Sequence, residues 1–171
     1  MWPVSRFAPF INLGLPSYDE GMTTTVGHWI DNKEVPSTSG RTAPVYDPAL
    51  GVETKRVALA NAAEINAAIA SAKKAFPGWS KTSLAARQQI VFKFRELLNA
   101  KKGELAEIIT SEHGKVLSDA LGEITRGQEV VEFAVGMPQL IKGYYSENVS
   151  TGVDVYSTRQ ALGVVGIISP F

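Results

Sequence analysis

The segment 156–171, with the sequence YSTRQALGVVGIISPF, constrains the fold of this chain more than any other stretch. Its second half is a β-branched run, Val164, Val165, Ile167 and Ile168, which Pro170 ends. A short apolar run between a glycine and a proline predicts a strand buried on both faces, as in the parallel sheet of an α/β protein. Such strands place ligand-binding residues just beyond their carboxyl ends. Here that end coincides with the end of the sequence, so we expect the chain to be the front part of something larger.

The composition limits the partners and chemistry that the chain can have. Its 17 Lys or Arg residues balance 17 Asp or Glu residues, which removes the electrostatic case for nucleic acid or an anionic membrane as partner. With no cysteine, the chain has no thiolate nucleophile, disulfide framework or cysteine metal site. Its two histidines, His28 and His113, are expected to be surface or capping residues rather than metal ligands. No apolar run reaches the roughly 20 residues of a membrane span, so a soluble cytoplasmic protein is expected.

Residues 1–21 have no pattern that predicts a helix, a strand or a targeting signal. Pro3, Pro9 and Pro16 break any helix, and Arg6 is the only basic residue, whereas a mitochondrial presequence is Arg-rich and amphipathic. We expect a disordered extension, with Met22 as the more natural start.

A small antiparallel sheet is predicted next. The turn Asp31-Asn32 divides residues 28–35 into two short strands, and residues 42–46 and 53–58 form two more around the turn 47–51.

Four helices are predicted to follow the sheet. Asn61 and Glu64 have the spacing of a capping box, and Pro77-Gly78 is expected to end the helix that they start. The other helices are expected from residue 82 or 83 through Leu98, from 103 to 112, and from 116 to 135, with a restart at Pro138 that ends at Gly143. The order of sheet, helical layer, hairpin arm and buried strand predicts an α/β fold.

No catalytic residue can be named from these patterns. Gly114-Lys115 lacks the earlier glycine of a phosphate-binding loop, so Lys115 is expected to cap the end of the third helix. Gly163-Val-Val-Gly166 lacks the third glycine of a dinucleotide fingerprint. The acidic residues Glu123, Glu129 and Glu132 are expected to share a solvated helix face with Arg126.

Several longer motifs resemble a known family. The runs AAIASAKKAFPGWSKTSLAARQQIVFKFRELL (67–98), TSEHGKVLSDALGEITRGQEVVEFA (110–134) and LGVVGIISPF (162–171) are similar to the amino-terminal third of aldehyde dehydrogenases. Within that superfamily, GHWIDNKEV, SGRTAPVYDPALG and STGVDVYSTRQALGVVGI most resemble the methylmalonate-semialdehyde dehydrogenases. Ala161 departs from the family, which usually has proline there.

The resemblance implies an NAD-dependent, CoA-acylating oxidation of methylmalonate or malonate semialdehyde, which yields propionyl- or acetyl-CoA, CO2 and NADH. In the family a cysteine attacks the aldehyde, and an asparagine after the Pro-Phe pair holds the oxyanion. Both lie beyond Phe171, so the 171 residues alone are predicted to be inactive. Ser169 and Phe171 match positions that contact the cofactor, and no metal site is implied.

The resemblance also implies a division of the chain. Residues 22–148 correspond to the amino-terminal part of the NAD-binding domain, 149–162 to an oligomerisation arm strand, and 163–171 to the first strand of the cofactor-binding sheet. A homo-oligomer, dimer or tetramer, is implied for the full-length enzyme. Two hypotheses stay open: an incomplete amino-terminal portion of the enzyme, or a truncated copy that acts as an assembly module with full-length subunits. A third hypothesis, a generic helical interaction protein, leaves the likeness to the family unexplained.

Overall fold

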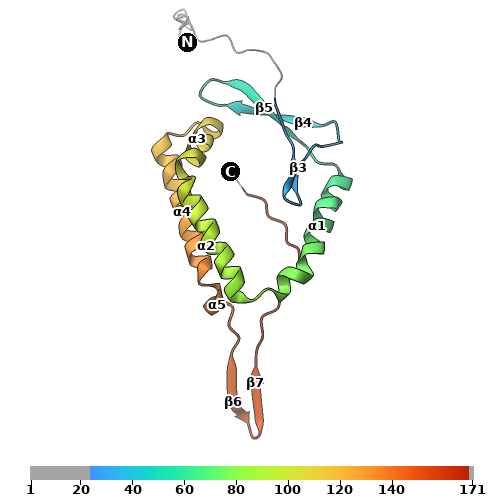
Figure 1. Ribbon diagram of the computed structural model, residues 1–171, viewed down its shortest axis with the longest axis vertical. Helices are drawn as coiled ribbons and strands as arrows, with labels where there is room; N and C mark the ends of the chain where they lie inside the picture. Colours follow the sequence, from blue (N-terminus) through green and yellow to red (C-terminus); the bar gives the residue numbers. More distant parts are fainter. Residues whose placement is uncertain (1–23, 170–171) are drawn as a thin grey trace, which may run out of the picture.

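The computed structural model describes residues 24–169 and has three parts along its longest axis (Figure 1). A strand-rich patch lies at one end, helices form the middle, and a hairpin projects at the other end. The predicted extension 1–21 and the predicted cofactor contact Phe171 both lie outside the described residues. The α/β class and the order of strand patch, helices and hairpin are confirmed.

Five short strands make the patch. They are β1 (Thr25–Val26), β2 (His28–Ile30), β3 (Lys33–Val35), β4 (Thr42–Asp47) and β5 (Val52–Ala58). The sheet order is β1-β5-β4, with β1 parallel and β4 antiparallel to β5, and β2–β3 form a separate hairpin. Asp31 and Asn32 have φ of 55° and 59°, the left-handed conformation that a two-residue hairpin turn requires. This turn confirms the prediction from the sequence.

Five helices follow: α1 (Ala62–Lys81), α2 (Leu84–Ala100), α3 (Lys102–His113), α4 (Leu117–Val135) and α5 (Met137–Leu140). At the start of α1, both side chains of the predicted capping box accept as expected, Asn61 Oδ1 from the Glu64 N–H and the Glu64 carboxylate from the Asn61 N–H. The Ser83 side chain caps α2. The small core lies between α3 and α4, where Ala106 and Ala120 are fully buried beside Ile124. Alanines at this crossing let the two helix backbones approach closely.

The predicted end of the first helix at Pro77-Gly78 is wrong, since α1 continues to Lys81. Proline removes one backbone donor and crowds the preceding turn. The helix nevertheless continues for one more turn, and the carbonyls of Pro77 and Gly78 in that last turn accept from Ser80 Oγ and Thr82 Oγ1, each at 3.1 Å. Trp79 therefore lies inside the helix, with the Arg87 guanidinium 5.8 Å from its ring centroid. The short helix α5 starts at the predicted proline but ends before Gly143.

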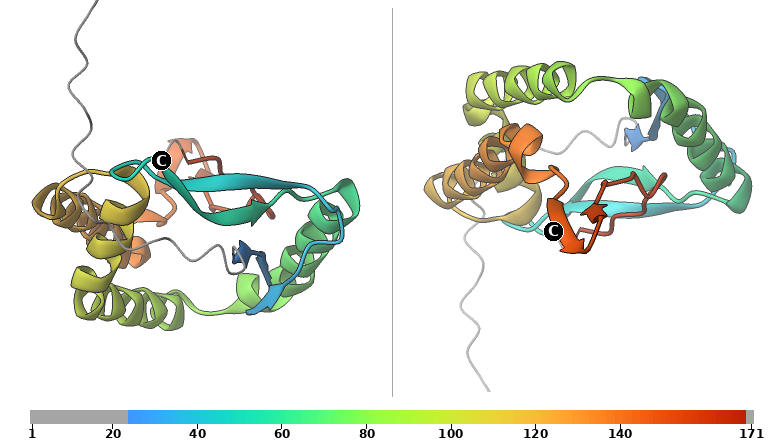
Figure 2. Two further views of the ribbon diagram at one scale, coloured as in Figure 1. Left: turned by 90° about the horizontal axis from the view of Figure 1, so that it is seen from above. Right: turned by 90° about the horizontal axis from the view of Figure 1, so that it is seen from below.

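The strands β6 (Tyr145–Ser150) and β7 (Val153–Tyr156) form the projecting hairpin. Residues 149–162, predicted as an oligomerisation arm strand, contain the end of β6, a turn at Thr151-Gly152 with Gly152 at φ 71°, and β7, and strand pairing ends at Tyr156. Their role in oligomerisation stays a prediction. The strand predicted for 164–168 is absent, because residues 157–169 have no strand beside them to pair with in the described part of the chain. After β7 the segment turns back toward the body (Figure 2).

Candidate functional site

The predicted cofactor contact Ser169 lies at the exposed end of the segment that follows the hairpin. The β-branched side chains before it are also uncovered, from 44% exposed at Val164 to 99% at Ile168. Phe171, the second predicted contact, lies outside the described residues. Ser169 as a cofactor contact therefore stays a prediction.

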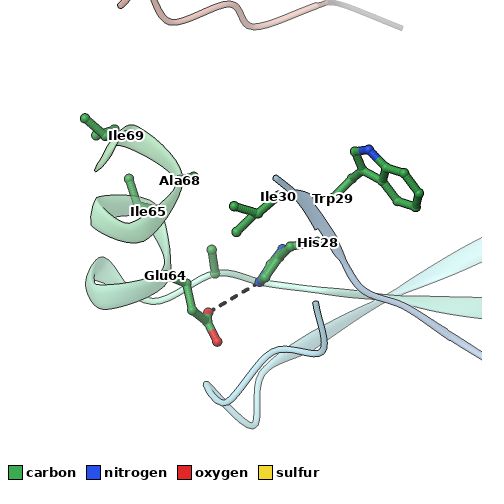
Figure 3. A pocket seen from close by; sticks show the side chains of 8 residues that line it. His28, Trp29, Ile30, Glu64, Ile65, Ala68 and Ile69 are labelled. Carbon is green, nitrogen blue, oxygen red and sulfur yellow. Dashed lines mark hydrogen bonds and ion pairs between the residues drawn. The ribbon is translucent and has the colours of Figure 1, made fainter. Parts of the chain in front are cut away.

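An open hollow of about 340 Å³ lies between β2 and the first turns of α1 (Figure 3). Its wall is apolar, with Ile30 from β2 and Ile65 and Ile69 from α1. At one side, His28 Nε2 lies 3.4 Å from Glu64 Oε2. The hollow thus combines an apolar wall with one histidine–carboxylate pair.

The carboxylate of Glu64 accepts several hydrogen bonds and is not free to act on a ligand. It accepts from the backbone N–H of Asn61 at 2.8 Å and from that of Thr38, and also from the hydroxyls of Ser37 and Thr38. These donors, the Asn61 amide first, lower the pKa of Glu64 to about 2. A carboxylate with so low a pKa is a poor general base at neutral pH. The role of Glu64 is therefore structural: its hydrogen bonds join the β2–β3 hairpin and the 37–38 loop to α1.

The sequence showed only half of this hydrogen-bond network. The Asn61–Glu64 spacing predicts the capping box, but Ser37 and Thr38 lie 27 and 26 residues away from Glu64, beyond any local pattern. His28, predicted to be an ordinary surface or capping residue, is instead partly covered and joined to the same carboxylate.

Lys115 does not cap α3 as predicted. Gly114 ends that helix in the left-handed conformation, with φ 83°. The Lys115 ammonium donates to Asp119 at 3.0 Å and to Glu123, and these two carboxylates raise its pKa, Glu123 contributing most. The Glu132 prediction also needs correction, because this carboxylate pairs with Arg95 of α2 at 2.7 Å rather than with Arg126.

The helical layer has an apolar groove of about 360 Å³. Phe94 and Leu98 of α2, Ile108 of α3 and Val131 of α4 are among its lining residues, and none of the lining side chains is charged. Such a surface offers packing area rather than chemistry. A Cβ built on Gly122 or Gly127 of α4 would meet no atom within 4 Å among the described residues.

Within residues 24–169, no group of three His, Asp or Glu side chains is placed to hold a metal ion. In the same range, no helix is both long and apolar enough to cross a membrane. The described surface therefore consists of structural ion pairs, apolar faces and one exposed hairpin.

The fold places the chain among the dehydrogenases of known structure. It matches a structure from Sinorhizobium meliloti 1021, described as a methylmalonate-semialdehyde dehydrogenase complexed with NAD, with a TM-score of 0.81 and 44% identity. The match covers 84% of this chain and 29% of that one. Residues 35–171 match the aldehyde dehydrogenase family. The chain belongs to the aldehyde dehydrogenase family.

Characterised relatives point to one branch of that family. The chain is 40% identical over 144 residues to the malonate-semialdehyde dehydrogenase of Pseudomonas aeruginosa, which covers 84% of this chain and 29% of the relative. It is 43% identical over 150 residues to the mitochondrial acylating methylmalonate-semialdehyde dehydrogenase of Arabidopsis thaliana, covering 88% of this chain and 25% of the relative. The chain thus spans less than a third of the length of the relatives that it matches.

Proposed function

We propose that this chain provides the amino-terminal scaffold of an NAD-dependent, CoA-acylating methylmalonate- or malonate-semialdehyde dehydrogenase. The observation that carries the proposal is the likeness of residues 24–169 to the Sinorhizobium meliloti structure, together with relatives described as semialdehyde dehydrogenases. The chain contains no cysteine. We propose that the cysteine which attacks the aldehyde in this family is not among these 171 residues, and that the 171 residues alone are inactive.

NAD is the proposed cofactor, and CoA the proposed second substrate. Ser169 is exposed and its hydroxyl is open to a ligand. The segment Gly163-Val-Val-Gly166 opens no helix, so it offers no helix N-terminus to a pyrophosphate. Residues 24–169 therefore do not form a complete dinucleotide site, and no hydride-transfer step can be derived from them.

The exposed hairpin supports the second hypothesis, a role in assembly. All residues of β6 and β7 are exposed, including Tyr145, Val155 and Tyr156, although a two-stranded hairpin is marginal in water by itself. The hairpin carries Glu147 and Asp154, whereas Lys142 and Arg159 flank its base. Two hairpins that lie tip to base would bring opposite charges together, so we propose a second subunit as the partner, whether in a homo-oligomer or with full-length subunits.

A chimeric enzyme tests the proposed activity. In it, residues 24–171 replace the aligned segment of the Pseudomonas aeruginosa enzyme, and NADH and acyl-CoA formation are measured with malonate and methylmalonate semialdehyde. We expect NADH formation that requires CoA, and none from the purified 171-residue chain. A soluble, assembled chimera without activity, or activity of the 171-residue chain alone, would contradict the proposal.

Ser169→Ala in the chimera tests the proposed cofactor contact. Loss of one neutral hydrogen bond should raise the KM for NAD by about 2- to 10-fold and leave the KM for the semialdehyde unchanged. Ser146→Ala, on the exposed strand β6, is the matched control. Equal effects of the two substitutions would remove Ser169 from the site.

A cytoplasmic location is likewise a proposal, since the Arabidopsis thaliana relative is described as mitochondrial. Fractionation of cells that express the 171-residue chain with a carboxyl-terminal tag will decide between the two compartments.

A further inference from the structure

The hairpin joins the body through a narrow neck in which the two chain segments touch. Gly143 precedes β6 and Ser157 follows β7. A Cβ built on Gly143 would overlap the carbonyl oxygen of Ser157 and lie 2.9 Å from its carbonyl carbon. Both are backbone atoms, which cannot turn aside as the end of a flexible side chain can. Only glycine therefore fits at position 143 while the neck keeps this geometry.

The requirement at Gly143 comes from packing and not from backbone conformation. Gly143 is not among the glycines with positive φ, unlike Gly152 in the hairpin turn. An alanine could adopt the same φ and ψ in isolation. Its methyl group would instead push the two segments of the neck apart.

Three hydrogen bonds hold the two segments at this distance. The Tyr144 backbone N–H donates to Ser157 Oγ at 2.9 Å, and the Ser157 N–H donates to the Tyr144 carbonyl at 2.8 Å. One step further from the hairpin, Arg159 Nε donates to the Lys142 carbonyl at 3.3 Å. The close approach at Gly143 lies in the middle of this set.

The contacts within β6 and β7 do not fix the direction of the hairpin relative to the helices. Every residue of β6 and β7 is exposed, and each strand packs extensively only against the other. Inside the hairpin, Asp154 accepts from Tyr145 Oη at 2.7 Å and from the Asn148 N–H at 2.9 Å, which stiffens the hairpin but does not attach it to the helices. The angle between hairpin and body is therefore set at the neck.

We infer that Gly143 and Ser157 are positioning residues that fix the direction of the hairpin and so determine how a second copy of the chain docks on it. The inference rests on the proposed role of the hairpin in assembly. Gly143 acts by allowing the close approach, and Ser157 acts by holding it through its hydroxyl and its backbone.

Distance measurements by electron spin resonance test the neck directly in the 171-residue chain. Because the chain has no cysteine, spin labels can be attached at Gln89→Cys on α2 and Glu147→Cys on the hairpin without removing native residues. We expect one narrow distance distribution. Gly143→Ala should shift and broaden it, and Ser157→Ala should broaden it less, because only the hydroxyl is lost. A distribution that is already broad with Gly143, or unchanged by Gly143→Ala, would overturn the inference.

Two controls separate the neck from general unfolding. Gly122→Ala adds the same methyl group in α4, where it meets nothing within 4 Å, and should leave the distribution unchanged. A second label pair, Gln89→Cys with Glu129→Cys, reports on the body and should stay narrow in Gly143→Ala. If Gly143→Ala disturbs both pairs equally, Gly143 serves overall folding and the inference fails.

The proposal that the hairpin is an assembly surface is tested separately, by sedimentation of the chimeric enzyme. Val155→Asp on the hairpin should shift the chimeric enzyme toward smaller species in sedimentation, whereas Val130→Asp, at an exposed position of α4, should not. If Val155→Asp has no effect, the hairpin is not the assembly surface, yet the label distances still report whether the neck sets its direction. If Val155→Asp disrupts assembly and Gly143→Ala leaves both assembly and distances intact, the neck inference alone is wrong.

Discussion

Glu64 shows how one side chain can connect segments that are distant in sequence. It satisfies the open N-terminus of α1 and at the same time binds the 37–38 loop and His28. The local half of this arrangement could be predicted from the sequence, since a capping box has a fixed spacing. The distant half depends on how β2, β3 and α1 are placed, which no local pattern encodes.

Replacing Glu64 by glutamine should lower the melting temperature and change its dependence on pH. The Glu64 pKa falls from 4.5 to about 2 on folding, so the ionised carboxylate stabilises the fold fully above about pH 4.5, and this stabilisation is lost as the pH falls toward 2. In Glu64→Gln, melting followed by circular dichroism should fall less steeply over this range. Glu129→Gln, exposed on α4, should retain the steeper decline, and equal slopes for both variants would refute the role of Glu64.

Ala106 tests the close packing of α3 against α4. Ala106 is fully buried, with 0% of its surface exposed, in the small cluster with Ala120 and Ile124. Ala106→Leu should reduce the free energy of unfolding by about 1–3 kcal/mol, because the larger side chain must push the helices apart. Ala85→Leu, at an exposed position of α2, should change it by less than about 0.5 kcal/mol. Urea unfolding measured for both variants will show whether this contact is as tight as the structure indicates.

At the scale of elements, the local signals in the sequence predicted most of the fold. The Asp31-Asn32 turn, the β4–β5 pair and the starts of α1 and α2 follow from turn and capping chemistry. Pro77 misled the prediction because a proline removes only one backbone donor from a helix, and α1 continues past it to Lys81. The run 164–168 misled it because strand formation needs a neighbouring strand, and none is present in residues 24–169.

The helix α1 should be much less protected than α4, in which Ala120, Ile124 and Gln128 are buried. Helix α1 has no buried residue, and its apolar residues Ile65, Ile69 and Trp79 are about half exposed. Helices draw most of their stability from tertiary packing. Amide hydrogen exchange should therefore be faster in the middle of α1 than around Ala120 and Ile124 in α4. Equal protection of the two helices would show that α1 is covered in solution.

At the scale of the whole molecule, the chain has more apolar surface than its own elements cover. The groove on the helical layer, the inner face of α1 and the segment 164–168 all remain open. The segment that this chain matches is only 29% of the Pseudomonas aeruginosa relative. Sequence reasoning could identify the family from motifs along the chain. Of the two predicted site residues, only Ser169 is among the described residues.

The central claim is that residues 164–168 become a buried strand only when further parts of a dehydrogenase cover them. Four fully buried Val or Ile side chains would contribute about 6–12 kcal/mol, a large share of the roughly 5–15 kcal/mol that stabilises a typical domain. Without that cover, the exposed segment is also a template for pairing with other chains.

Amide hydrogen exchange of residues 164–168, compared between the monomeric 171-residue chain and the chimeric enzyme, tests this claim most directly. The helix α2 around Phe94 serves as the internal reference in both proteins. We predict exchange near the rate of an unfolded peptide in the free chain, and protection equal to that of α2 in the chimera. Residues 164–168 as protected as α2 in the monomeric free chain would contradict the account.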